Sequence, residues 1–156
     1  MVSKNDEMFI EKSIEIAWKA REKGNHPFGA LIVDPDGNII ITAENAVVTS
    51  RDCTAHAELL AVREASMGFD REFLSKCTLY ASTEPCPMCA GAIYWGNILR
   101  LAFGLSQEGL YEITGLSGKE SLIFSCEELF SKGNKEIQVI GPLLEEKARK
   151  VHENFW

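Results

Sequence analysis

The stretch "STEPCPMCAG" (residues 82–91) places two cysteines, Cys86 and Cys89, three residues apart behind a proline. Such a CxxC pair occurs in structural zinc sites, in thiol-redox sites and in catalytic metal sites, so its role depends on what else in the chain completes it. The surrounding sequence predicts a strand over 77–83 and a helix over 85–96, because the early prolines suit a first helical turn.

The segments on either side of this strand and helix predict an α/β domain over residues 1–156. Apolar spacing predicts helices, and "FGALIVDPDGNIIITAENAVV" predicts two strands around the turn at 34–37. The glycine-rich segment 106–121 is left unassigned. We expect a sheet of about five strands with helices on both faces. The other predicted elements are helices at 5–23, 54–67, 122–133 and 143–156, and strands at 98–105 and 136–141.

Composition and charge limit the functions that this chain of 156 residues can have. The net charge is −7, and no cluster of lysines and arginines is visible, which favours a small substrate over nucleic acid. The apolar runs are too short to cross a membrane, and the charged N-terminus lacks the apolar core of a signal peptide. Five irregularly spaced cysteines indicate a reducing compartment. We therefore expect a cytoplasmic protein.

The cysteine pair can be completed by His56, which opens the predicted helix over 54–67 as Cys86 and Cys89 open the next one. Two helix N-termini can lie side by side at one edge of a sheet in a layered α/β fold. One imidazole and two thiolates suit zinc, and three protein ligands leave a fourth position for water, as in catalytic sites. We therefore expect one Zn²⁺ per chain.

Glu58 follows His56 by two residues at the start of the same predicted helix. A carboxylate beside a metal-activated water can take its proton and later return it to a leaving group. The pattern thus predicts hydrolytic chemistry with Glu58 as acid and base. A catalytically idle zinc fold that serves as an interaction module is the alternative class, and the presence of Glu58 argues against it.

The combination of "HAE" (56–58) and "PCPMC" (85–89) resembles the HxE…PCxxC signature of the zinc-dependent cytidine-deaminase superfamily. The segments 27–34, 45–58 and 79–104 look like its nucleobase and tRNA-adenosine branch. The resemblance implies a three-layer α/β/α cytidine-deaminase-like fold with a mixed sheet and a homodimer. It also implies zinc on the histidine and both cysteines, and Glu58 as the proton shuttle in hydrolytic release of ammonia from an amino-substituted ring.

The motifs "PFGA" (27–30) and "GAIYW" (91–95) are most similar to guanine deaminases, which implies a small purine substrate, guanine, converted with water to xanthine. The tRNA-specific adenosine deaminases are the nearest alternative. Cytosine, a nucleoside (guanosine or adenosine) and an aminotriazine are further alternatives. The resemblance implies substrate contacts by Phe28, Asn45, the backbone of Ala57 and Trp95, and a lid formed by Phe155 and Trp156.

Two departures from the guanine-deaminase pattern are visible. Cys53 stands where proline is common, and the segment 106–121 does not align, so Glu108 and Glu112 are no more than candidates for a second acidic residue in proton transfer. Of the remaining histidines, we expect His26 to lie in a loop beside the pocket entrance and His152 to be a solvated residue on the last helix.

Overall fold

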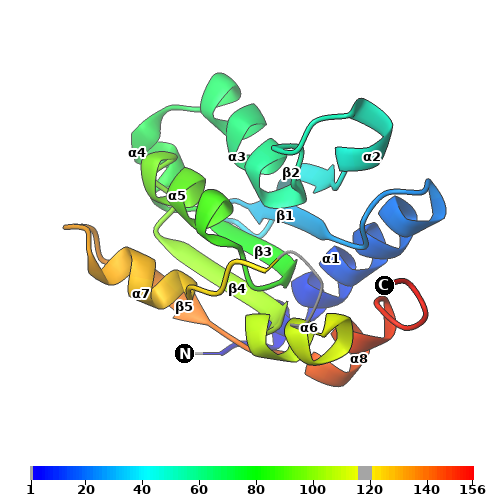
Figure 1. Cartoon of the computed structure of the whole chain (residues 1–156). Coiled ribbons are helices and arrows are strands. Elements are labelled where there is room, and N and C mark those ends of the chain that lie inside the picture. The colour runs from blue at the N-terminus through cyan, green and yellow to red at the C-terminus, as the bar shows by residue number, and fades with distance from the viewer. Residues whose placement is uncertain (1, 116–120) are drawn as a thin grey trace.

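In the computed structural model, residues 2–115 and 121–156 are described, and their five strands form one mixed sheet (Figure 1). The strand order is β2-β1-β3-β4-β5. Strand β1 is antiparallel to both of its neighbours, whereas β3, β4 and β5 are parallel to one another. The predicted mixed α/β fold is therefore confirmed. The strands are β1 (Gly29–Val33), β2 (Ile39–Glu44), β3 (Thr78–Thr83), β4 (Arg100–Leu105) and β5 (Gln138–Ile140).

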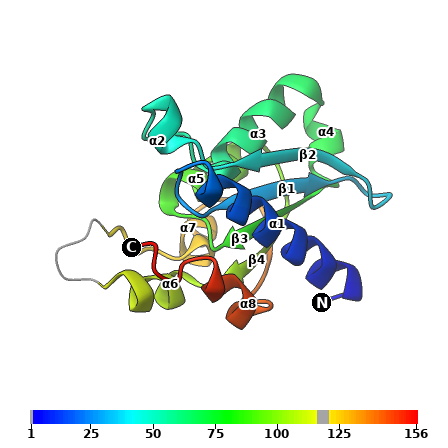
Figure 2. The same cartoon turned by 90° about the vertical axis from the view of Figure 1, so that its right-hand side faces the viewer.

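Helices cover both faces of the sheet (Figures 1 and 2). Helices α1 (Lys4–Glu22) and α8 (Glu145–Lys150) pack on one face, and α3 (Ala57–Gly68) and α5 (Pro87–Trp95) pack on the other. All five residues of β1 are consequently buried, which explains why "GALIV" is a continuous apolar run rather than an alternating one. No helix in the described part of the chain is long and apolar enough to cross a membrane.

A buried ion pair fastens the first helix to the sheet. Asp6 is 1% exposed and caps the start of α1 together with Ser3, while both guanidinium nitrogens of Arg100 lie 2.9 Å from its carboxylate oxygens. The hydroxyl of Tyr80 donates to the same carboxylate at 2.6 Å. Burial acts to raise the pKa of Asp6, but the hydrogen bonds from Arg100 and Tyr80 outweigh it and hold the pKa well below its usual range.

The structure corrects three sequence predictions. The unassigned segment 106–121 contains a helix, α6 (Gln107–Thr114), while 116–120 lie outside the described residues. The helix predicted over 122–133 is limited to α7 (Cys126–Ser131). The helix predicted over 143–156 is limited to α8, after which the chain turns back through Asn154, whose φ is +57°. Two short helices, α2 (Val47–Ser50) and α4 (Arg71–Leu74), were not expected.

Candidate active site

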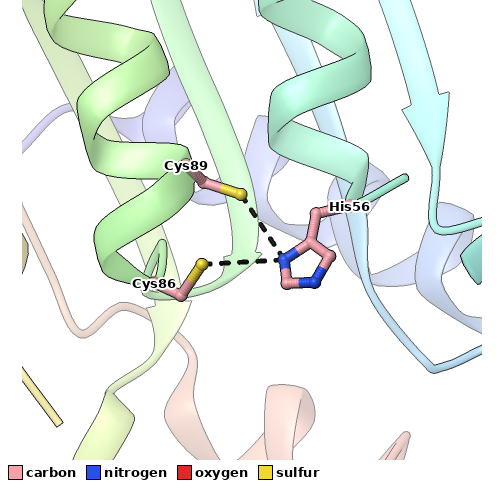
Figure 3. Close-up of side chains that lie close together, drawn as sticks. All are labelled: His56, Cys86 and Cys89. Atoms are coloured by element: carbon pink, nitrogen blue, oxygen red, sulfur yellow. Dashed lines mark hydrogen bonds between the residues drawn. The ribbon is translucent and has the colours of Figure 1, made fainter. Parts of the chain in front are cut away.

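The N-terminal ends of α3 and α5 bring together one imidazole and two thiols (Figure 3). Nδ1 of His56 lies 3.6 Å from Sγ of Cys86 and 3.5 Å from Sγ of Cys89. Zinc binds sulfur at about 2.3 Å and imidazole nitrogen at about 2.0–2.1 Å, so a tetrahedral site requires an N–S separation of about 3.6 Å. The three side chains therefore fit a zinc ion without rearrangement of these distances.

Local sequence explains how the two helix ends reach one another. His56 and Cys86 are the N-cap residues of α3 and α5, and Pro87 occupies the first turn of α5, where a missing N–H costs nothing. At the far end of α5, a Cβ on Gly96 would lie 2.6 Å from Cγ1 of Val62 in α3. The absence of a side chain there lets the two helices pack closely.

The electrostatics of this cluster favour the thiolate form of Cys86. Hydrogen bonds from Cys89 and His56 lower the pKa of Cys86 to about 4, although burial opposes this. The hydrogen bond with Cys86 raises the pKa of His56. The hydrogen bond between Cys89 and Cys86, together with burial, raises the pKa of Cys89. The cluster thus carries a thiolate at neutral pH, and thiolate is the ligand form that binds zinc.

Glu58 lies in the first turn of α3 and is 5% exposed. Burial raises its pKa to about 7. A carboxyl group whose pKa lies near the working pH can both accept and donate a proton, which is the property that a general acid and base requires.

Glu58, His56 and Cys86 line a common cavity of about 310 Å³. Its walls come from the loop before β1, from the end of β3, from α6 and from the C-terminal tail. The other lining residues are His26, Phe28, Thr83, Glu84, Gln107, Leu110, Tyr111, Thr114 and Trp156.

The structure brings some of the predicted substrate contacts to this cavity. Phe28 forms part of its wall. Asn45 is not among the lining residues, but it is buried next to Phe28. Its backbone N–H donates to the carbonyl of Phe28 at 3.0 Å, and its Oδ1 accepts from the N–H of Val47. Ala57 is buried as the first residue of α3, where backbone N–H groups have no partner within the helix.

Trp95 is not brought to the cavity. It ends α5 at the opposite end from Cys86, is 74% exposed, and contacts Tyr94 and the ammonium group of Lys135 instead. The two acidic candidates of the 106–121 segment also lie outside the described cavity lining. Glu112 pairs with Arg149, and Glu108 lines a separate acidic cavity next to Glu84.

The C-terminal tail folds back next to α6 (Figures 1 and 2), and its residue Trp156 lines the cavity. The ring of Trp156 lies 5.4 Å from that of His26 and 6.1 Å from that of Phe28. Phe155 packs against His26 at 6.2 Å and beneath the guanidinium of Arg21. The tail is therefore a wall of the cavity in the structure of the single chain.

Several lining residues were missed by the sequence analysis. Helix α6 contributes Gln107, Leu110, Tyr111 and Thr114, whose spacing of three and four residues behind the N-cap Ser106 was the available signal. His152 was expected to be solvated, and this is wrong. It is 0% exposed, because the tail turns back and covers it.

Comparison with known proteins agrees with this site. A family model described as the cytidine and deoxycytidylate deaminase zinc-binding region matches residues 3–105, which is more than half of the chain. Among solved structures, a guanine deaminase from Nitrosomonas europaea superposes with a TM-score of 0.79 at 25% identity, covering 97% of this chain and 84% of that one.

Three curated relatives differ from one another in activity. The chain is 41% identical to a probable cytosine deaminase of Schizosaccharomyces pombe over 99% of its own length and 94% of that protein. It is 48% identical to a guanine deaminase of Bacillus subtilis over 60% of each protein, and 37% identical to a tRNA-specific adenosine deaminase of Haemophilus influenzae over 98% of this chain and 84% of that one. The chain therefore belongs to the cytidine and deoxycytidylate deaminase family and is a zinc-dependent hydrolytic deaminase.

Proposed function

We propose that this protein removes the exocyclic amino group of a free purine base, guanine, to give xanthine and ammonia. The observation that carries the proposal is the position of the Glu58 carboxyl beside the His56–Cys86–Cys89 cluster, in a cavity whose walls include Phe28, Tyr111 and Trp156. Aromatic side chains of this kind suit a flat heterocycle, which they contact on its faces.

In the reaction, water adds to the ring carbon that bears the amino group, and that group leaves as ammonia. When bound by His56, Cys86 and Cys89, zinc supplies a Lewis acid that favours loss of a proton from water near neutral pH. The Glu58 carboxylate accepts that proton and delivers it to the ring nitrogen beside the reacting carbon. Glu58 then takes the second proton from the hydroxyl group now on that carbon and passes it to the amino nitrogen. The C–N bond breaks with release of ammonia as the carbonyl group of the product forms.

Within the cavity, we propose that Phe28 stacks on the base and that Asn45 and the backbone of Ala57 bind its edge. Phe155 and Trp156 act as a lid. Their packing on His26 and Phe28 supports this role. The volume of about 310 Å³ accommodates a purine ring system, and the likeness to two guanine deaminases supports a purine.

Cytosine is the second candidate, because the relative from Schizosaccharomyces pombe matches nearly the whole of this chain. An adenosine of tRNA is less well supported, despite the tRNA-specific relative. The net charge of −7 offers little attraction to a polyanion, and Trp156 takes up part of the cavity wall.

We also propose that residues 1–156 act as one deaminase domain in the cytoplasm, and that it forms a homodimer through the surface around Tyr94 and Trp95. The exposure of Trp95 beside Tyr94 supports such an interface, since exposed apolar patches are often contact surfaces. The five strands of the described residues form one sheet, and helices as far apart in the chain as α1 and α8 pack on it, which supports a single domain.

A panel of bases tests the substrate directly. The zinc-loaded protein is incubated with guanine, cytosine, adenine, guanosine, adenosine, an aminotriazine and a tRNA, and ammonia is measured together with the identity of the product. We expect the highest kcat/KM with guanine and xanthine as its product. Turnover of cytosine but not guanine would replace the proposal by the second candidate, and activity on tRNA alone would contradict both.

A further inference from the structure

A buried histidine outside the zinc cluster is hydrogen-bonded at both ring nitrogens. Nδ1 of His152 lies 3.1 Å from Nε1 of Trp156, and its Nε2 lies 3.4 Å from Oγ1 of Thr83. The His152 ring also packs against Phe28, with ring centroids 5.3 Å apart. His152 therefore connects the C-terminal residue to the end of β3, which is part of the cavity wall.

The chemistry of the three groups fixes the direction of these hydrogen bonds. An indole N–H can only donate, so Nδ1 of His152 is the acceptor. Burial, with the charge of Arg21 adding to it, lowers the pKa of His152 to about 4, so the ring is neutral at pH 7. Its single hydrogen is therefore on Nε2, and Nε2–H donates to the hydroxyl oxygen of Thr83.

Thr83 is left with a donor that the protein does not use. Its side chain is almost fully buried, with a residue exposure of 2%, and it lines the cavity. Because its oxygen accepts from His152, its own hydrogen is free to donate, and it has no acceptor among the residues that the structure describes. A buried hydroxyl hydrogen without a protein acceptor at a cavity wall is best satisfied by a ligand.

Several other donors of the wall already have acceptors within the protein. The amide of Gln107 donates to the carbonyls of Pro85 and Phe124, each at 3.0 Å. The hydroxyls of Tyr111 and Thr114 donate to backbone carbonyls, and the indole of Trp156 is engaged by His152. The carboxyl groups of Glu58 and Glu84 supply acceptors for the amino and ring N–H groups of a base.

We propose that Thr83 is a specificity-determining residue that donates a hydrogen bond to an acceptor atom of the substrate ring, a carbonyl oxygen or a bare ring nitrogen. His152 and Trp156 are positioning residues that set the direction of the Thr83 hydroxyl. This inference rests on the proposed function, since it assumes that a free base occupies the cavity.

Contacts to α1 hold the C-terminal tail in the position that these hydrogen bonds require. The guanidinium of Arg21, on α1, donates to the carbonyl of Val151 at 2.8 Å and to that of Glu153 at 2.7 Å. These two contacts hold the turn after α8 on both sides of His152. The hydroxyl of Thr83 is thus oriented by residues from two distant parts of the chain, α1 and the C-terminal tail.

The test compares Thr83→Val, which removes the hydroxyl at nearly constant shape, with Thr83→Ser, which keeps it. Each variant is assayed with the base that the wild type turns over and with analogues that each lack one acceptor. For guanine these are 2-aminopurine, 7-deazaguanine and 3-deazaguanine, and for cytosine 4-aminopyrimidine, scored as substrates or competitive inhibitors. Zinc content and thermal unfolding confirm that each variant is folded.

We expect Thr83→Val to lower kcat/KM for the parent base by about tenfold, the effect of one hydrogen bond, and Thr83→Ser to retain most of the activity. For the analogue that lacks the atom contacted by Thr83, kcat/KM should be the same in Thr83→Val as in the wild type. Trp156→Phe keeps an aromatic wall but removes the N–H that His152 accepts. It should therefore lower kcat/KM for the parent base more than kcat/KM for that analogue.

Equal losses for the parent base and every analogue would overturn the role of Thr83, as would a Thr83→Ser variant as impaired as Thr83→Val. A wild type that turns over no free base would instead overturn the proposed function itself, and the two failures are thereby distinguished.

Discussion

Nδ1 of His56 lies 3.6 Å from Sγ of Cys86, although thirty positions separate the two residues in the chain. The contact exists because each residue is an N-cap, one on α3 and one on α5, and these helices pack side by side on the same face of the sheet. Ligand geometry at the zinc site is therefore set by the packing of two helices rather than by a flexible loop.

Removal of the metal should destabilise the protein. A zinc ion that binds the folded chain and not the unfolded one stabilises the fold by mass action. We expect Cys86→Ala to lower the zinc content from one per chain to near zero and to lower the melting temperature. A chelator should shift the wild type towards the variant and leave the variant unchanged. If the chelator left the melting temperature of the wild type unchanged, the assignment of the zinc site would be contradicted.

The Asp6–Arg100 pair predicts a local stability effect far from the zinc site. Asp6→Ala removes the buried carboxylate that accepts hydrogen bonds from Arg100 and Tyr80, and we expect a loss of about 3 kcal/mol in the free energy of unfolding. The matched control is Glu72→Ala, which breaks the exposed i,i+4 pair with Lys76 and should cost less than about 0.5 kcal/mol. Denaturant unfolding that gives equal losses would contradict this assignment.

His152 predicts a loss of stability in mild acid. Its pKa is lowered by burial to about 4, below the ordinary value of about 6.5. Between these values the unfolded chain takes up a proton that the folded chain does not, so stability falls as the pH is lowered. From pH 7 to pH 5 this amounts to about 2 kcal/mol. In His152→Gln the fall in the free energy of unfolding between pH 7 and pH 5 should be smaller by that amount. An equal fall in the two proteins would show that His152 is not buried in neutral form.

The parts of the fold with strong local patterns could be predicted from sequence. The hairpin turn, the continuous apolar strands and the helix-opening ligands each have a short-range cause that the sequence displays. Helix α6 was not predicted, because glycines such as Gly109 left the segment 106–121 unassigned. In the structure, a Cβ there would lie 2.6 Å from Cδ1 of Leu105, so the glycine serves close packing within a helix. The reason for this glycine lies in packing, so the local signal for α6 is limited to the spacing of its cavity-lining residues behind Ser106.

The C-terminal tail illustrates the same limit at the site. The sequence "VHENFW" continues a helical pattern, and nothing local marks the end of α8 at Lys150. The turn is held by Arg21, more than a hundred positions away, which binds the carbonyls that follow the helix. His152 was consequently expected in solvent, although the tail buries it beside Thr83. By contrast, the spacing of "HAE" and "PCPMC" was sufficient to identify the zinc ligands that the fold brings together.

The most direct test of the account is the Glu58→Gln variant, because it removes only the proton shuttle. The zinc content of the purified variant and its rate of ammonia release from guanine are measured beside the wild type. We expect one zinc per chain in both proteins and a fall in kcat of at least about 100-fold in the variant. A variant that retains zinc and releases ammonia at the wild-type rate would contradict the assignment of Glu58 as acid and base.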